Sequence, residues 1–178
     1  IRPEATGYGT VYFAEEMLKH QGRSFEGLRV SVSGAGNVAQ YAVEKAMAMG
    51  AKVVTVSDSS GTVIDESGFT PEKLAELMEV KNHLYGRVSE YAKRVGATFQ
   101  PGVRPWHVPV DVALPCATQN ELDGEDAKTL LKNGVICVAE GANMPSTADA
   151  VKVFEGNGVL YALGKASNAG GVATAGLE

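Results

Sequence analysis

Apolar residues are distributed along the chain in two alternating patterns. In short runs, neighbouring positions are apolar or small, and such runs occupy residues 28–33, 52–57, 97–99, 110–114, 135–138 and 159–162. In the longer segments between most of these runs, apolar residues recur every three or four positions. Short runs that are apolar on both faces predict strands of a covered parallel sheet, and the longer segments predict helices.

Local signals set the ends of the predicted helices. An opening helix over 3–20 has Pro3 near its first turn and Gly22 after its end, and Gly50 ends a helix over 37–49. In "TPEKLAELMEVKNH", Thr70 is the predicted N-cap and Pro71 the first helical residue. Further helices are predicted in "GRVSEYAKRVG" and over 124–132 and 147–154, with a short extra strand over 62–64.

This order of elements predicts an α/β fold, a doubly wound and mostly parallel sheet of the Rossmann type with helices on both faces. The chain has 178 residues, 44% of them hydrophobic, which is enough for one good core. We find no internal repeat and no low-complexity linker, so a single domain over 1–178 is expected.

The stretch "SGAGNVAQ" joins the first predicted strand to the second predicted helix. Gly34, Gly36 and Ala39 give the spacing G-x-G-x-x-A. In dinucleotide-binding folds the first position makes a tight turn, the second lets the backbone approach a diphosphate, and the third lets the helix pack on the strand. The alternative is an ordinary strand-to-helix turn, which also favours glycine.

An acidic residue strengthens the dinucleotide interpretation. Asp58 ends the second strand 22 residues after Gly36, near the offset of about 20 expected for a carboxylate that binds an adenosine ribose. Such an acid favours NAD, whereas Ser59, Ser60, Lys81 and Arg87 offer hydroxyls and cations for the 2′-phosphate of NADP. The residues alone leave NAD and NADP as alternatives.

Polar sequences follow three later strands, in "PCATQNEL", "AEGANMP" and "GKASNAGGVATAGLE". Ligands of open α/β sheets bind beyond the carboxyl ends of the strands, so these segments are expected at the binding edge. Their uncharged hydrogen-bonding groups suit a ribose or a carboxamide better than a metal ion, and no metal site is expected. The alternative is that they only cap helices and form turns. The side chains concerned are Thr118, Gln119, Asn120, Asn143 and Asn168.

Charge and composition exclude several partners. A net charge of −5 and a pI near 5.3 argue against nucleic acid or an anionic membrane as the main partner. No apolar run approaches the ~20 residues of a membrane span, and no signal segment opens the chain. Cys116 and Cys137 lie in apolar runs, which predicts reduced thiols in the core of a cytoplasmic protein.

Six blocks together resemble the hexameric glutamate dehydrogenases, most strongly the NADP-using bacterial type. They are "RPEATGYGTVYF", "VSVSGAGNVAQYAVEKA", "SDSSGTVIDESGFT", "PVDVALPCATQNEL", "VAEGANMP" and "ASNAGGVATAGLE". The resemblance implies reversible oxidative deamination of L-glutamate to 2-oxoglutarate and ammonia with NADP(H). It also implies that the full-length protein is a homohexamer with small-molecule substrates. The alternatives are another amino-acid dehydrogenase of the leucine, phenylalanine or valine type and a non-catalytic nucleotide-binding module.

The resemblance also assigns roles to individual positions. Thr6 matches a threonine at the nicotinamide carboxamide, Asp58 and Ser59 match the adenosine-ribose end, and Lys81 matches a 2′-phosphate contact. Asn143 and Asn168 match asparagines near the nicotinamide and its ribose. The remaining predicted cofactor residues are Gly34, Ala35, Gly36, Asn37, Val38, Ala117 and Thr118.

The substrate side of the site departs from the family pattern. Val172 is expected to line the substrate pocket, but Ala175 replaces the serine of the family's "TSGLE", which hydrogen-bonds a substrate carboxylate. Ala35 stands where NADP-using relatives often have serine.

No catalytic residue is expected within the chain. In the family an amino-terminal domain brings the catalytic lysine and aspartate, and Lys165 is more simply a surface residue. We therefore expect a coenzyme-binding domain that binds NADP, with NAD as the alternative, and does not turn over alone.

Overall fold

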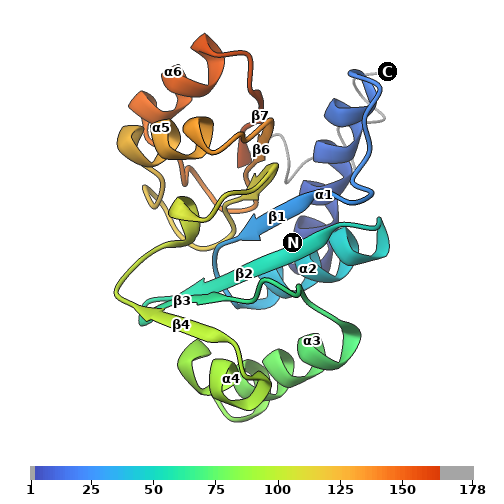
Figure 1. The fold of residues 1–178 in the computed structure, drawn as a ribbon, viewed down its shortest axis with the longest axis vertical. Helices are drawn as coiled ribbons and strands as arrows, with labels where there is room; N and C mark the ends of the chain where they lie inside the picture. The colour runs from blue at the N-terminus through green and yellow to red at the C-terminus, as the bar shows by residue number, and fades with distance from the viewer. Residues whose placement is uncertain (1–2, 165–178) are drawn as a thin grey trace.

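The computed structural model describes residues 3–164, which contain one mixed β-sheet with helices on both faces (Figure 1). In this part of the chain the sheet has seven strands in the order β4-β3-β2-β1-β5-β6-β7. The strands are β1 (Arg29–Val32), β2 (Lys52–Asp58), β3 (Gly61–Ile64), β4 (Thr98–Pro101), β5 (Val112–Leu114), β6 (Cys137–Ala139) and β7 (Leu160–Ala162). The predicted α/β class is confirmed, and most predicted strand ends agree within two residues.

Five neighbouring strands, β2, β1, β5, β6 and β7, run parallel, whereas β3 and β4 form an antiparallel edge. Strand β1 lies between β2 and β5: the chain first builds the sheet from β1 towards one edge through β2, β3 and β4, and then returns to build it towards the other edge through β5, β6 and β7. Such a reversal of strand order opens a crevice at the carboxyl ends of the two central strands. In this fold the crevice lies beyond β1 and β5.

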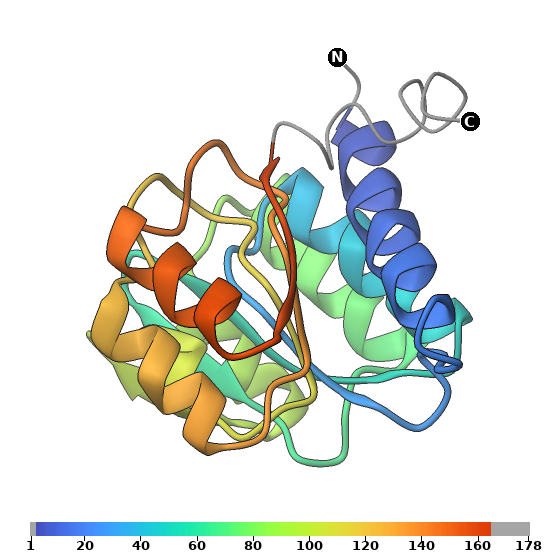
Figure 2. The same cartoon turned by 90° about the horizontal axis from the view of Figure 1, so that it is seen from above.

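The helices form two layers (Figure 2). One face carries α1 (Pro3–Lys19), α2 (Asn37–Ala48), α3 (Pro71–Met78), the π-helical turn η1 (Glu79–His83) and α4 (Val88–Val95). The other face carries the 3₁₀ turn η2 (Pro105–His107), α5 (Gly124–Lys132) and α6 (Ala148–Gly156). The sheet separates two apolar clusters, one under each layer.

Three local features of the helices and strands lie close to the binding edge of the sheet or lead towards it. As predicted, the Thr70 hydroxyl caps α3 by accepting from the N–H of Lys73 at 3.2 Å. The predicted single helix over "TPEKLAELMEVKNH" is incomplete, because α3 ends at Met78 and continues as the wider turn η1. In β2 an extra residue opposite β1 shifts the register, since Val30 pairs with Val53 but Ser31 pairs with Thr55.

Candidate cofactor-binding site

Gly34 makes the turn that the sequence predicted. Its φ is +87°, and a Cβ there would lie 2.8 Å from the carbonyl oxygen of Cys116. Ser57 of β2 stabilises this turn, because its hydroxyl accepts a hydrogen bond from the N–H of Gly34 at 2.9 Å. The Ser57 N–H also donates to the Gly34 carbonyl at 3.1 Å. Gly34 therefore fixes the backbone of the loop that joins β1 to α2, and no larger residue fits there.

Gly36 has a different position. It is the N-cap of α2, with an extended backbone (φ −81°, ψ −168°), and a Cβ there would meet nothing within 4 Å. No side chain caps α2, and its first turn contains no acidic residue. The first N–H groups of α2 and the positive end of its dipole thus face open space, an arrangement that suits an anion such as a diphosphate.

A pocket of about 410 Å³ opens at this point and collects most of the predicted cofactor residues. Its lining residues are Gly34, Ala35, Gly36, Asn37, Val38, Ser57, Asp58, Lys81, Cys116 and Ala117. They come from the loop after β1, the start of α2, the end of β2, the turn η1 and the loop after β5. The sequence did not predict Ser57, because its function is a hydrogen bond to a residue 23 positions away.

Asp58 lies at one end of this pocket, and both of its carboxylate oxygens have partners. The N–H and hydroxyl of Ser60 donate to Oδ1, the former at 2.8 Å. Oδ2 accepts from Nζ of Lys81 at 3.1 Å and from the N–H of Val88 at 2.8 Å. A carboxylate has about four acceptor positions, so a ribose hydroxyl would have to displace one of these donors.

The charge on Asp58 is stabilised despite its partial burial. Burial favours the protonated form, but hydrogen bonds from Ser60, Val88 and Lys81 outweigh it and lower the pKa of Asp58. The carboxylate also lies at the first residue of α4, where the helix dipole favours a negative charge. Asp58 therefore remains ionised and keeps the Lys81 ammonium beside the pocket.

A buried acid, Glu121, lies behind the loop after β5, which supplies Cys116 and Ala117 to the pocket. One of its oxygens accepts from the N–H groups of Ala117 and Thr118, both at 3.0 Å, and its side chain is almost fully buried. Ser33, the residue after β1, accepts from the N–H of Cys116 at 2.9 Å and also hydrogen-bonds Glu121. Burial raises the pKa of Glu121 more than these bonds lower it. This network fixes the loop after β5, and nothing in "PCATQNEL" distinguishes a buried glutamate from a surface one.

The strand-end loops meet as predicted, although several predicted residues lie outside the pocket. The loops after β5 and β6 pair through the N–H of Asn120 and the carbonyl of Met144 at 3.0 Å. Thr118 and Asn143 are exposed on these two loops, and Ser59 is exposed at the turn after β2. Thr6 is buried on α1, a helix that packs on α2 partly through the Tyr8 hydroxyl and Glu44.

Some predicted residues lie outside the described part of the chain. They are Asn168, Val172 and Ala175, together with Lys165. The two cysteines, Cys116 and Cys137, are free and buried as expected, and burial raises the pKa of the Cys137 thiol to about 12. Among the helices of residues 3–164, each is too short or too polar to cross a membrane.

Comparison with known proteins agrees with this geometry. All 178 residues match the sequence pattern of the Glutamate/Leucine/Phenylalanine/Valine dehydrogenase family. The chain is 68% identical to the NADP-specific glutamate dehydrogenase of Salmonella typhimurium and 66% identical to that of Escherichia coli. Each alignment covers 100% of this chain but 40% of the relative, so the chain spans less than half the length of these proteins.

A solved structure gives the same result. Glutamate dehydrogenase of Plasmodium falciparum superimposes with a TM-score of 0.92 at 49% sequence identity, over 98% of this chain and 38% of its own. The Rossmann-type fold and the resemblance seen in the sequence are both confirmed. The chain belongs to the Glutamate/Leucine/Phenylalanine/Valine dehydrogenase family.

Proposed function

We propose that this chain is the coenzyme-binding domain of an NADP-dependent glutamate dehydrogenase. The full protein would convert L-glutamate, water and NADP⁺ into 2-oxoglutarate, ammonium, NADPH and a proton, and would also run the reverse reaction. The relatives at 66% and 68% identity carry the name NADP-specific glutamate dehydrogenase, which supports both the reaction and the coenzyme. The bound coenzyme supplies the hydride acceptor.

The observation that carries the proposal is the open first turn of α2. Gly36 leaves that turn clear of side chains, and the pocket beside it ends at Asp58 and Lys81. In our proposal the amides of Gly36, Asn37 and Val38 bind the diphosphate, and Lys81 binds the 2′-phosphate. Ser59, Thr118 and Asn143 are exposed on the strand-end loops and would contact the riboses, and Thr6 would lie nearer the nicotinamide. Asn168 lies outside the described residues and keeps only the role that the resemblance implies, near the nicotinamide and its ribose.

The hydrogen bonds that Asp58 already accepts support NADP over NAD as the coenzyme. Its oxygens already accept four hydrogen bonds, so a free 2′-hydroxyl would gain no unoccupied acceptor there. The ammonium of Lys81 has three N–H donors, and one of them donates to Asp58. The remaining donors make Lys81 suitable for a phosphate oxygen.

Replacing Lys81 with glutamine is expected to weaken NADPH binding by about 10- to 100-fold, because one charge-assisted hydrogen bond of roughly 1.5–3 kcal/mol is lost. The variant also leaves Asp58 without its cation, so that its charge repels the 2′-phosphate. NADH affinity should change by less than about threefold. Fluorescence titration of both coenzymes measures the two effects.

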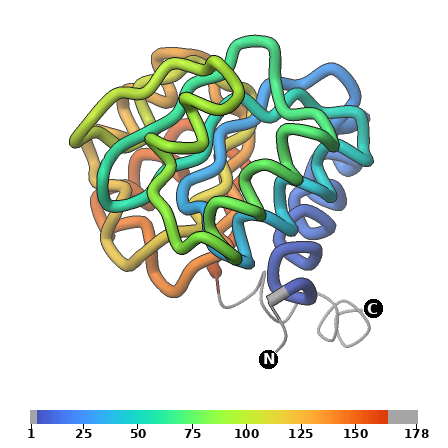
Figure 3. Tube along the Cα trace, turned by 90° about the horizontal axis from the view of Figure 1, so that it is seen from below, coloured from blue at the N-terminus to red at the C-terminus, as the bar shows by residue number. Residues whose placement is uncertain are grey.

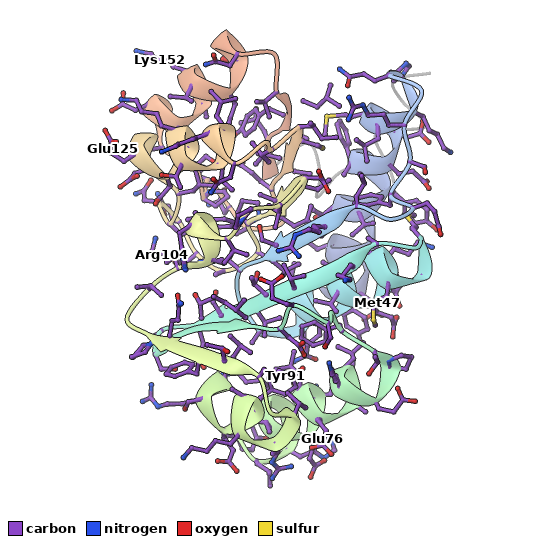
Figure 4. The ribbon with its side chains drawn as sticks, in the orientation of Figure 1. Met47, Glu76, Tyr91, Arg104, Glu125 and Lys152 are labelled. Atoms are coloured by element: carbon purple, nitrogen blue, oxygen red, sulfur yellow. The ribbon has the colours of Figure 1, made fainter. Side chains whose placement is uncertain are left out.

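The matched control is Lys152→Gln on α6, on the opposite face of the sheet (Figure 4). It should leave both affinities unchanged. Equal loss of NADH and NADPH affinity in Lys81→Gln, or no loss of either, would contradict a 2′-phosphate role for Lys81.

We propose that the rest of the full-length protein supplies the substrate-binding and catalytic groups, and that this chain alone binds coenzyme without turnover. The relatives are more than twice as long as the chain, which supports this division. We also propose a cytoplasmic homohexamer. The resemblance to hexameric enzymes supports the assembly, and the two buried free thiols agree with a reducing compartment.

An apolar amino acid is the second candidate substrate. Ala175 stands where the family pattern has a serine that binds the substrate carboxylate, and Val172 would line the same pocket. Steady-state kcat/KM values of the full-length enzyme for glutamate, leucine and phenylalanine decide between the two. A higher value for either apolar amino acid would replace glutamate in the proposal.

A further inference from the structure

The turn that carries Lys81 is widened. Residues Glu79–His83 form the π-helical turn η1 directly after α3, and Lys81 is its middle residue. Such wide turns are rare and occur frequently at functional sites. The turn and α3 lie beside α2, the helix that begins at the glycine loop (Figure 3).

A pair of amide side chains joins η1 to α2. Nε2 of Gln40 donates to Oδ1 of Asn82 at 3.0 Å, and Nδ2 of Asn82 donates to Oε1 of Gln40 at 3.0 Å. Gln40 is 1% exposed, whereas Asn82 lies at the surface. Each amide therefore satisfies the other, and Asn82 is the accessible end of the pair.

The second N–H of Gln40 reaches the glycine loop. Nε2 also donates to the carbonyl of Ala35 at 2.8 Å. A carbonyl oxygen only accepts, so this bond fixes the orientation of the Gln40 amide and, through it, that of Asn82. One buried side chain thus connects the loop proposed to hold the diphosphate with the turn proposed to hold the 2′-phosphate.

Lys81 is the residue next to this anchor. Its ammonium lies 3.1 Å from Oδ2 of Asp58, and the same oxygen accepts from Val88 beyond the turn. The turn is therefore fixed on one side by Gln40 and on the other by Asp58. A lysine has a long flexible stem, so holding the backbone of its turn limits the positions that its ammonium can reach.

We propose that Asn82 is a positioning residue for NADP selectivity, which acts through Gln40 to hold Lys81 at the Asp58 end of the pocket. This inference rests on the proposed NADP function. It assigns the preference for NADP over NAD to the Gln40–Asn82 pair as well as to Lys81. Asn82 itself makes no contact with the coenzyme in this proposal.

Replacing Asn82 with alanine is expected to weaken NADPH binding by about three- to tenfold, the size of one or two ordinary hydrogen bonds. NADH affinity should change by less than about twofold, because the glycine loop is kept. The measurement is a fluorescence titration of the 178-residue chain with each coenzyme, and thermal melting checks the fold. His83→Ala, an exposed change in the same turn, is the matched control and should change neither affinity.

A double variant tests whether Asn82 acts through Lys81. In the Lys81→Gln background, adding Asn82→Ala should cause less than about a twofold further loss of NADPH affinity, because coupled residues are not additive. Full additivity, or an equal loss of NADH and NADPH in Asn82→Ala alone, would overturn the positioning role. If Lys81→Gln weakens NADPH but Asn82→Ala does not, only this inference fails. If Lys81→Gln has no effect on NADPH, the proposed coenzyme preference fails as well.

Discussion

Replacing Gly36 with valine is expected to weaken the binding of NADPH and NADH alike, by at least about 100-fold. The new side chain would occupy the open space before α2, where a Cβ now meets no atom within 4 Å. The diphosphate would then lose two or more N–H contacts, each a hydrogen bond to a charged group of roughly 1.5–3 kcal/mol. Isothermal titration of the variant and the parent with both coenzymes measures the loss.

The fold should tolerate this change. Gly36 has an extended backbone that valine also adopts, and the poorer helix cap costs about 1 kcal/mol, or a melting temperature lower by about 2–4 °C. Gly156→Val, at the end of α6, is the control because a Cβ there is equally free of contacts. Unchanged coenzyme affinity in Gly36→Val would mean that the diphosphate binds elsewhere.

Gly34 would not give such a clean test. Its positive φ and its 2.8 Å approach to the Cys116 carbonyl make any side chain there destabilising. Loss of binding in a Gly34 variant would therefore mix a damaged fold with a blocked site. In our proposal the two glycines of one motif thus have separable functions, since Gly34 fixes the fold and Gly36 would leave space for the ligand.

Replacing Glu121 with alanine is expected to destabilise the fold by about 2–4 kcal/mol. The change leaves the Ala117 and Thr118 N–H groups without their acceptor and opens a cavity under the loop after β5. For a chain of this length the melting temperature should fall by roughly 4–16 °C. Urea unfolding and thermal melting measure the loss, with Glu125→Ala on the exposed side of α5 as control (Figure 4).

Glu121→Gln separates the charge from the hydrogen bonds. Its amide oxygen can accept both N–H groups, so most of the stability should remain at neutral pH. Burial raises the pKa of Glu121 above its usual 4.5, so the folded state binds this proton more tightly than the unfolded state. The part of the stability that depends on protonation of Glu121 is therefore full below pH 4.5 and is lost as the pH rises through the folded-state pKa. As the pH rises through that range, the stability of Glu121→Gln should therefore increase relative to that of the parent. A relative decrease would contradict the account.

Most of the fold follows from local signals in the sequence. Thr70 with Pro71 predicts the start of α3, Gly50 predicts the end of α2, and the valine-rich runs at 28–33 and 52–57 predict strands β1 and β2. Each of these features depends on residues within about one turn or one strand. They could therefore be predicted without knowing which distant residues they contact.

The remainder depends on contacts between distant residues. The antiparallel edge of β3 and β4 is set by pairing, such as Val63 with Phe99, that a short apolar run does not specify. The π turn that carries Lys81 is anchored by Gln40, 42 positions before Asn82. Burial of Glu121 likewise depends on Ser33 and Trp106, whose indole N–H donates to the Glu121 carbonyl at 3.0 Å.

In the predicted site, too, some features follow from the local sequence and others depend on distant contacts. The glycine motif and Asp58 lie together in one pocket because the strand-helix-strand unit β1-α2-β2 fixes their spacing. The occupied state of the Asp58 carboxylate was not predictable, because two of its donors, Lys81 and Val88, come from a segment 23 to 30 residues later. This occupied carboxylate favours NADP where the sequence alone left both coenzymes open.

The central claim is that the backbone amides at the start of α2 hold the diphosphate of the coenzyme. Two-dimensional amide NMR of the 178-residue chain, titrated with NADPH, tests it most directly. The account predicts the largest shifts at the N–H signals of Gly36, Asn37 and Val38, followed by those around Lys81. Saturable binding that leaves these amides unshifted would contradict it.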